Sequence, residues 1–108
     1  MRYIVASTAL IVACSIASPS LAQDAASGRT LAGQCRTCHG LDGIAQIPIA
    51  PNLAGESQIY LEKQLKAFRS GERENEMMSV VAKNLTDEQI SDLSAWYASI
   101  KITATMPE

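Results

Sequence analysis

The sequence is poor in several residue types, and each shortage argues against a class of function. It has one histidine, His39, and three cysteines, so a zinc site of Cys and His ligands would need Cys14 from a segment that we expect to be removed. It has no excess of Lys and Arg, and its formal net charge is -2 at pH 7; this argues against nucleic-acid binding, which needs a basic patch. It lacks internal repeats and low-complexity tracts, which favours a single domain.

The first 22 residues have the pattern of a secretory signal peptide. Arg2 precedes the apolar run of residues 3–13, and Ser-Leu-Ala at residues 20–22 puts small residues at the two positions that signal peptidase reads. The run is too short for a transmembrane span, which needs about 20 apolar residues. We therefore expect residues 1–22 to be cleaved and residues 23–108 to form one periplasmic domain without a transmembrane segment.

Cys14 leaves a second route of export open. The sequence Ile-Val-Ala-Cys at residues 11–14 also fits lipoprotein processing, which would leave a lipid-anchored thiol, although residues 20–22 fit the general signal pattern better. Either route delivers the chain outside the inner membrane. There, oxidising conditions would close two neighbouring thiols into a disulfide unless they were kept reduced and then capped.

The most specific feature is residues 35–39, which read Cys-Arg-Thr-Cys-His. Two cysteines at this spacing, followed at once by histidine, form the attachment site of a c-type haem. Cys35 and Cys38 would form thioethers with one edge of the porphyrin, and His39 would come under the iron as its proximal ligand. Without the histidine, the two cysteines would best be interpreted as a thioredoxin-like redox pair or as half of a zinc site. The chain has neither the βαβ pattern that the first needs nor the further zinc ligands that the second needs. The motif therefore predicts one thioether-linked haem c per chain.

The order of polar and apolar residues predicts helices and no strand. Ser57 is expected to be the N-cap of one helix and Gly71 its end, and Thr86 and Gln89 form a capping box for the last helix. Residues 41–55, rich in Gly, Pro and Asn, read as a loop. We therefore expect an all-α domain, in which the first and last helices cross, with helices at residues 25–38, 57–70 and 86–100.

With these features the chain resembles the class I monohaem cytochromes c of bacteria, and especially one half of the tandem dihaem cytochromes c of respiratory chains. The resemblance covers nearly all of residues 25–101. It implies the cytochrome c fold, about four helices wrapped around one covalently bound haem, and one-electron transfer instead of enzymatic catalysis. Besides the haem motif, its signals in chain order are Gly28, Leu31, Gly40, Asp42-Gly43, Pro51-Asn52-Leu53-Ala54-Gly55, Tyr60-Leu61, Gln64-Leu65, Phe68-Arg69, Gly71, Arg73, Met78 and Leu85-Thr86-Asp87.

The resemblance also implies methionine as the second axial ligand of the iron. Met1 leaves with the leader and Met106 lies beyond the last helix, which leaves Met77 and Met78. We prefer Met78, because it keeps the family's distance of eight residues before Thr86, and keep Met77 as the fallback. A thioether ligand favours ferrous iron and, with both axial positions filled, leaves no room for oxygen, which suits an electron carrier.

Other side chains have both a functional and a structural interpretation. Pro51 follows His39 by twelve positions, the family's spacing for a carbonyl that accepts a hydrogen bond from the imidazole Nδ1; a simple turn proline is the alternative. Trp96 and Tyr97 are interpreted as packing residues. Three side chains are candidates for hydrogen bonds to the haem propionates, and core packing or a solvated helix face is the alternative for each: Tyr60, Arg69 and Arg73.

Electron transfer needs one haem edge at the surface, and we expect Ile44, Ile47 and Ile49 to ring it. The expected partners are redox proteins, met in small and transient contacts: a membrane cytochrome complex, a terminal oxidase or a periplasmic dehydrogenase. The chain itself is expected to be a monomer or weak dimer. A dedicated haem subunit of a periplasmic dehydrogenase is the alternative, and a ligand-binding or catalytic haem protein ranks third.

Overall fold

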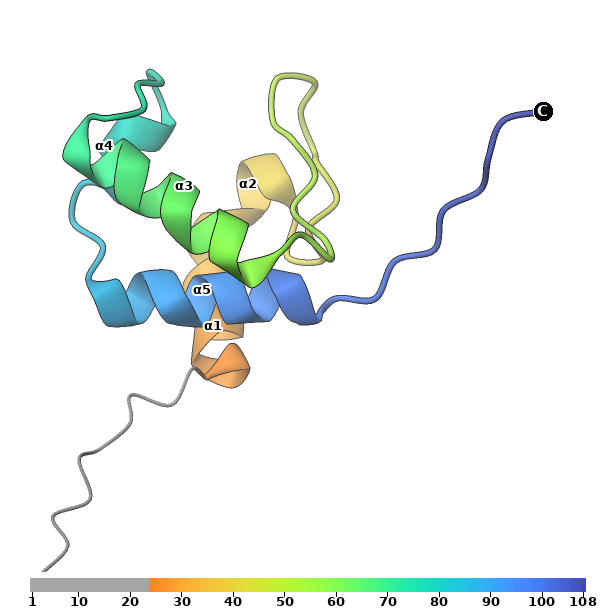
Figure 1. Cartoon of the computed structure of the whole chain (residues 1–108), viewed down its shortest axis with the longest axis horizontal. Coiled ribbons are helices and arrows are strands. Elements are labelled where there is room, and N and C mark those ends of the chain that lie inside the picture. The colour runs from red at the N-terminus through yellow and green to blue at the C-terminus, as the bar shows by residue number, and fades with distance from the viewer. Residues whose placement is uncertain (1–23) are drawn as a thin grey trace, which may run out of the picture.

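The structure, a computed structural model, describes residues 24–108. The expected leader, with Cys14 and the cleavage site, lies outside the described residues. Figure 1 shows helices joined by loops, and residues 24–108 contain no strand, so the prediction of an all-α fold is confirmed. In chain order the elements are α1 (Ala25–Leu31), the 3₁₀-helix η1 (Ala32–Gln34), α2 (Arg36–His39), α3 (Gln58–Ser70), α4 (Met78–Ala82) and α5 (Asp87–Ser99).

The segment expected to form one helix over residues 25–38 is divided into three pieces. After α1 ends at Leu31, the chain tightens into η1, in which the N–H of Cys35 donates to the carbonyl of Ala32 at 2.9 Å. Gly33 lies in this piece, where its weak helix propensity disfavours a continuous helix, and short 3₁₀ turns often connect helical segments. The prediction is therefore right for the helical character of the segment and wrong for its continuity.

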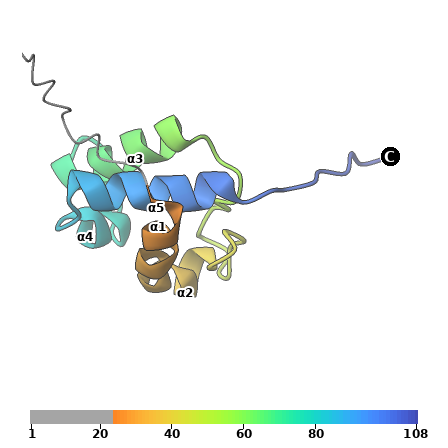
Figure 2. The same cartoon turned by 90° about the horizontal axis from the view of Figure 1, so that it is seen from below.

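The first and last helices cross in close contact, as predicted, with α1 lying across α5 (Figures 1 and 2). Gly28 lies at the crossing, where a Cβ atom would overlap the main-chain carbonyl of Asp92. The N–H of Asp24 also donates to the buried carboxylate of Asp92 at 2.9 Å. Glycine is therefore needed at position 28 because the backbones approach too closely for any side chain.

The predicted helix ends are present in α3 and α5. Ser57 Oγ accepts the N–H of Tyr60 at the start of α3, and Gly71 ends the helix with a φ of 84°, a conformation that glycine adopts without strain. Thr86 and Gln89 form the capping box at the start of α5. At the start of α4, the side chain of Asn75 accepts hydrogen bonds from the main-chain N–H groups of Met77 and Met78 at 3.0 and 2.9 Å.

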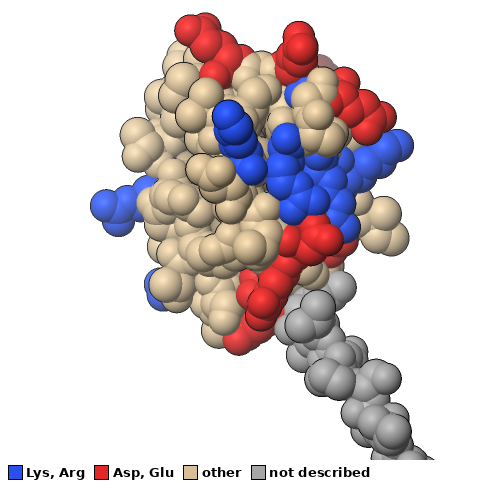
Figure 3. Space-filling model, turned by 90° about the vertical axis from the view of Figure 1, so that its left-hand side faces the viewer, with Lys and Arg blue, Asp and Glu red and all other residues tan. Residues whose placement is uncertain are grey.

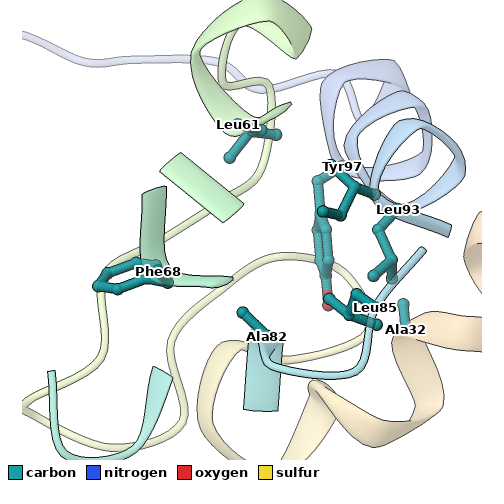
Figure 4. Packing of buried hydrophobic residues seen from close by; sticks show 8 residues of the cluster. Ala32, Leu61, Phe68, Ala82, Leu85, Leu93 and Tyr97 are labelled. Carbon is teal, nitrogen blue, oxygen red and sulfur yellow. The ribbon is translucent and has the colours of Figure 1, made fainter. Parts of the chain in front are cut away.

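The core lies between α3, α4 and α5, with η1 against it. In Figure 4, Leu61 and Phe68 of α3 lie on one side of the interior and Leu93 and Tyr97 of α5 on the other. Among residues 24–108, no helix is both long and apolar enough to span a bilayer. The buried cluster consists of Ala32, Leu61, Phe68, Ala82, Leu85, Ile90, Leu93 and Tyr97.

Candidate haem-attachment site

A single helical turn, α2, carries the expected attachment residues. Cys35 precedes this turn as its N-cap, and its carbonyl accepts the N–H of His39 at 3.0 Å. Residues three apart on a helical turn lie on one side of it, so Cys35 and Cys38 can meet the same edge of a flat ligand. Both are free thiols and half-buried. Gly40 then ends the turn with a φ of 72°, which releases the chain into the following loop.

His39 is held in one orientation by a main-chain carbonyl. Its Nδ1 lies 2.9 Å from the carbonyl oxygen of Pro51, and the side chain is buried, with 8% of its surface exposed. Because a carbonyl oxygen only accepts, Nδ1 carries the proton, and Nε2 keeps a lone pair for a metal. The predicted hydrogen bond from His39 to Pro51 is therefore present, and it leaves the imidazole in the form that binds iron.

The loop that carries Pro51 is cross-linked by its own hydrogen bonds. The carbonyl of Gly43 accepts N–H groups from Leu53 at 2.8 Å and Ala54 at 3.1 Å. The side chain of Asn52 accepts the N–H of Ala45 at 2.8 Å. These bonds fold the loop back on itself and fix Pro51 opposite His39.

Two aromatic side chains of α5 donate hydrogen bonds to main-chain carbonyls of the residues directly after His39. The indole Nε1 of Trp96 donates to the carbonyl of Leu41 at 2.9 Å, and the hydroxyl of Tyr97 donates to the carbonyl of Gly40 at 3.1 Å. Sequence reasoning assigned both residues to packing and missed these polar contacts. Nothing in the sequence signals them, because the bonded residues are 55 and 57 positions apart.

The surroundings of Cys35 favour neutral sulfur. Burial raises the pKa of the Cys35 thiol, and the neighbouring Tyr97 hydroxyl opposes this effect only in part. Cys35 also packs against the apolar cluster. A thioether is neutral and apolar, so the same surroundings suit the sulfur once it is bonded to a porphyrin. Two thiols on one turn and a free imidazole nitrogen thus fit a haem c in their chemistry.

The structure separates the two candidate methionines. Met78 is half-buried and packs against the core cluster, whereas the side chain of its neighbour Met77 is 59% exposed. A methionine that ligates iron inside a protein must point inward, and of this pair only Met78 does so.

The three side chains expected near the propionates have other surroundings. The guanidinium of Arg69 donates to the carbonyl of Leu85 at 2.9 Å and to the carboxylate of Asp87 at 2.6 Å. Arg73 donates to the side chain of Gln64 at 2.7 Å and lies over the ring of Phe68. Tyr60 is 48% exposed. For both arginines these contacts match the packing interpretation, and they provide no support for a role toward propionates.

These features define a protein of the c-type haem class: a helical domain, one helical turn with two thiols, and a histidine whose Nε2 is free to bind iron. The family model for cytochrome c matches residues 25–101. The chain therefore belongs to the cytochrome c family, whose members bind haem covalently.

Three similar proteins illustrate the relationship. Cytochrome c-554(548) of Halomonas halodenitrificans is 46% identical over an alignment of 81 residues, and the match covers 72% of this chain and 98% of the relative. The crystal structure of reduced recombinant cytochrome c4 from Pseudomonas stutzeri matches with a TM-score of 0.69 at 32% identity, over 74% of this chain and 47% of that one. Thiosulfate dehydrogenase from Marichromatium purpuratum matches with a TM-score of 0.66 at 36% identity, over 71% of this chain and 19% of that one. The chain thus spans nearly all of the first relative and about half of the second.

Proposed function

We propose that this protein carries single electrons between redox proteins in the periplasm, on one haem whose axial ligands are His39 and Met78. The observation that carries the proposal is the hydrogen bond of 2.9 Å between His39 Nδ1 and Pro51. It fixes the tautomer and raises the basicity of the ligand. The kinship with cytochrome c-554(548) and cytochrome c4 supports the same function.

Each residue of the site has a distinct task in this proposal. A bound haem c supplies an iron that exchanges one electron. Cys35 and Cys38 would hold the group covalently, and His39 Nε2 and the Met78 sulfur would bind the iron. With both axial positions taken by protein atoms, the chain excludes small molecules from the metal. This favours electron transfer over catalysis.

Several apolar side chains are exposed on the loop after the haem motif and on α4. Ile44 and Ile49 are 47% and 84% exposed, and Val80 of α4 is 72% exposed; Ile47 is half-buried. At the α4 end of the molecule, Lys and Arg side chains gather between two groups of Asp and Glu side chains (Figure 3). Exposed apolar side chains suit a small, transient contact with a partner protein. We propose that Ile44, Ile47 and Ile49 form part of it.

The first test is the visible spectrum of the oxidised protein, in which sulfur ligation to ferric iron gives a weak red band. We expect the wild type and Met77→Leu to have the band and Met78→Leu to lack it. Met77→Leu is the matched control, since it makes the same change one residue away at an exposed position. Absence of the band from the wild type would overturn His/Met ligation, and a ligand-binding or catalytic function would then be favoured.

A dedicated haem subunit of a dehydrogenase is the second candidate, and the match to part of a thiosulfate dehydrogenase favours it. Purification from the native organism distinguishes the two. A free carrier elutes as a small protein, whereas a subunit elutes with a stoichiometric partner chain that carries its own cofactor. Rapid binding of carbon monoxide to the reduced native protein would instead indicate an open iron site.

A further inference from the structure

Tyr97 of α5 contacts both ends of the loop that follows the haem motif. Its hydroxyl donates to the carbonyl of Gly40 at 3.1 Å, where the loop begins. Its own main-chain carbonyl accepts the N–H of Gly55 at 2.9 Å, where the loop ends. The residue is buried, with 3% of its surface exposed, so water does not compete for these bonds. One residue therefore closes the loop over residues 40–55.

The closed loop holds the hydrogen-bond acceptor of the proximal histidine. Pro51 lies within it, and its carbonyl accepts the Nδ1 proton of His39. The distance between His39 and Pro51 depends on where the loop begins and ends, since His39 directly precedes Gly40. A change at either end of the loop is thus transmitted to the imidazole.

We infer that Tyr97 is a positioning residue for His39, acting through the loop that carries Pro51. The inference rests on the proposed role of His39 as iron ligand. The strength of the Nδ1 hydrogen bond sets how basic the imidazole is, and so how well it stabilises ferric iron. If the loop relaxes, this bond weakens, ferric iron is less stabilised and the reduction potential rises. The Tyr97 phenol is protonated, and so able to donate, at physiological pH even at the ordinary tyrosine pKa of about 10, and burial raises its pKa further.

The test is Tyr97→Phe in the full haem-loaded protein, because this change removes the hydroxyl and keeps the ring. Thr30→Val is the matched control, since it removes an exposed hydroxyl that bonds within its own helix, to the carbonyl of Ala26, and keeps the shape of the side chain. Two quantities are measured: the reduction potential, and the hydrogen exchange rates of the amides of Leu53, Ala54 and Gly55. We expect Tyr97→Phe to raise the potential and to speed exchange, and Thr30→Val to change neither.

Several outcomes would overturn the inference. An unchanged potential with faster exchange means that Tyr97 supports the loop without acting on the iron. A changed potential with unchanged exchange means that the effect does not pass through the loop. The red sulfur band is recorded on both variants and the wild type; its absence from the wild type refutes the axial ligands of the proposed function, whereas its presence with an unchanged potential in Tyr97→Phe refutes only the role of Tyr97.

A second experiment avoids any loss of folding in Tyr97→Phe. In the Tyr60→Phe background, Tyr97 is the remaining tyrosine of residues 23–108, so growth with 3-fluorotyrosine labels this position in the mature chain. Fluorination makes the phenol a stronger donor while the ring keeps its shape. We expect the reduction potential to fall below that of the unlabelled Tyr60→Phe variant, which is opposite to the effect of Tyr97→Phe. Equal potentials of the labelled and unlabelled Tyr60→Phe variants would count against the inference.

Discussion

Ser94 carries the buried side-chain oxygen that has no hydrogen-bond partner within residues 24–108. It lies on α5 and is 1% exposed. A buried hydroxyl without a partner costs about 1–3 kcal/mol in lost hydration, and alanine is also the better helix former. We expect Ser94→Ala to raise the free energy of unfolding by roughly 1 kcal/mol, measured by denaturant titration of the haem-loaded protein.

The control for this prediction is Ser91→Ala on the same helix. The hydroxyl of Ser91 donates to the carboxylate of Glu62 at 3.3 Å, so that its removal should leave stability equal or lower. A less stable Ser94→Ala variant would mean that the Ser94 hydroxyl has a partner in the haem-loaded protein.

The pair Arg69 and Asp87 makes stability depend on pH. The hydrogen bond and the positive charge of Arg69 lower the pKa of Asp87 below its ordinary value. A carboxylate whose pKa is depressed by folding stabilises the protein above its unfolded pKa of about 3.9 and loses this effect as the pH falls through the folded pKa. We expect Asp87→Asn to be less stable than the wild type at pH 7, with the difference vanishing toward strongly acidic pH. Thermal unfolding across this range measures it.

Glu88→Gln is the control for the Asp87 prediction. It removes the same charge from the same first turn of α5, so it reports the interaction with the helix end alone. If the two variants lose stability equally, the contact between Arg69 and Asp87 contributes nothing of its own.

Among elements, those set by local chemistry were predictable from the sequence. The N-cap Ser57, the end at Gly71 and the capping box of Thr86 each depend on residues within one helical turn. The break after Leu31 was missed because periodicity alone reads residues 25–38 as one helix, although Gly33 is a local signal against a continuous helix. The haem motif was predicted from its spacing, and the link of His39 to Pro51 was expected from the family resemblance, with a simple turn proline as the alternative. The contacts of α5 with Gly40 and Leu41, in contrast, join segments distant in sequence. Such contacts follow from tertiary packing and leave no local pattern.

The crossing of α1 and α5 gives a prediction with a built-in control. Gly28→Ala would place its Cβ against the backbone of Asp92, which cannot yield as a flexible side chain would. Overpacking of this kind costs about 1–3 kcal/mol, and we expect the upper end of that range. Gly33→Ala is the control, since its Cβ would meet nothing within 4 Å, and it should raise stability by about 0.5–1 kcal/mol.

Denaturant unfolding of both glycine variants checks this prediction. Opposite signs would locate the constraint at the helix crossing. A loss of stability in Gly33→Ala as large as that in Gly28→Ala would mean that both glycines are kept for backbone freedom, and that the crossing tolerates a methyl group.

For the whole molecule, the limiting quantity is the size of the core. Within residues 24–108, four of the ten buried hydrophobic residues are alanines, which remove little apolar surface from water. A chain of this length supports only a small core and gains stability from a bound group. Leu41, Leu53, Leu65 and Met78 are only partly buried although they pack against the cluster. A large, flat, apolar ligand would cover the exposed parts of these side chains.

The fold should therefore depend on the attached haem. We expect Cys35→Ala/Cys38→Ala, which lacks both attachment points, to lose most of its far-ultraviolet circular dichroism at 25 °C, because a group bound only by the native state stabilises that state. Arg36→Ala/Thr37→Ala is the matched control; it changes two exposed residues of the same motif and keeps both thiols. This control should bind haem and keep a wild-type spectrum. If the cysteine variant instead unfolds cooperatively near the unfolding temperature of the wild type, the helical core is sufficient to keep the chain folded without haem. The partly buried side chains around Met78 would then not require a ligand for the stability of the fold.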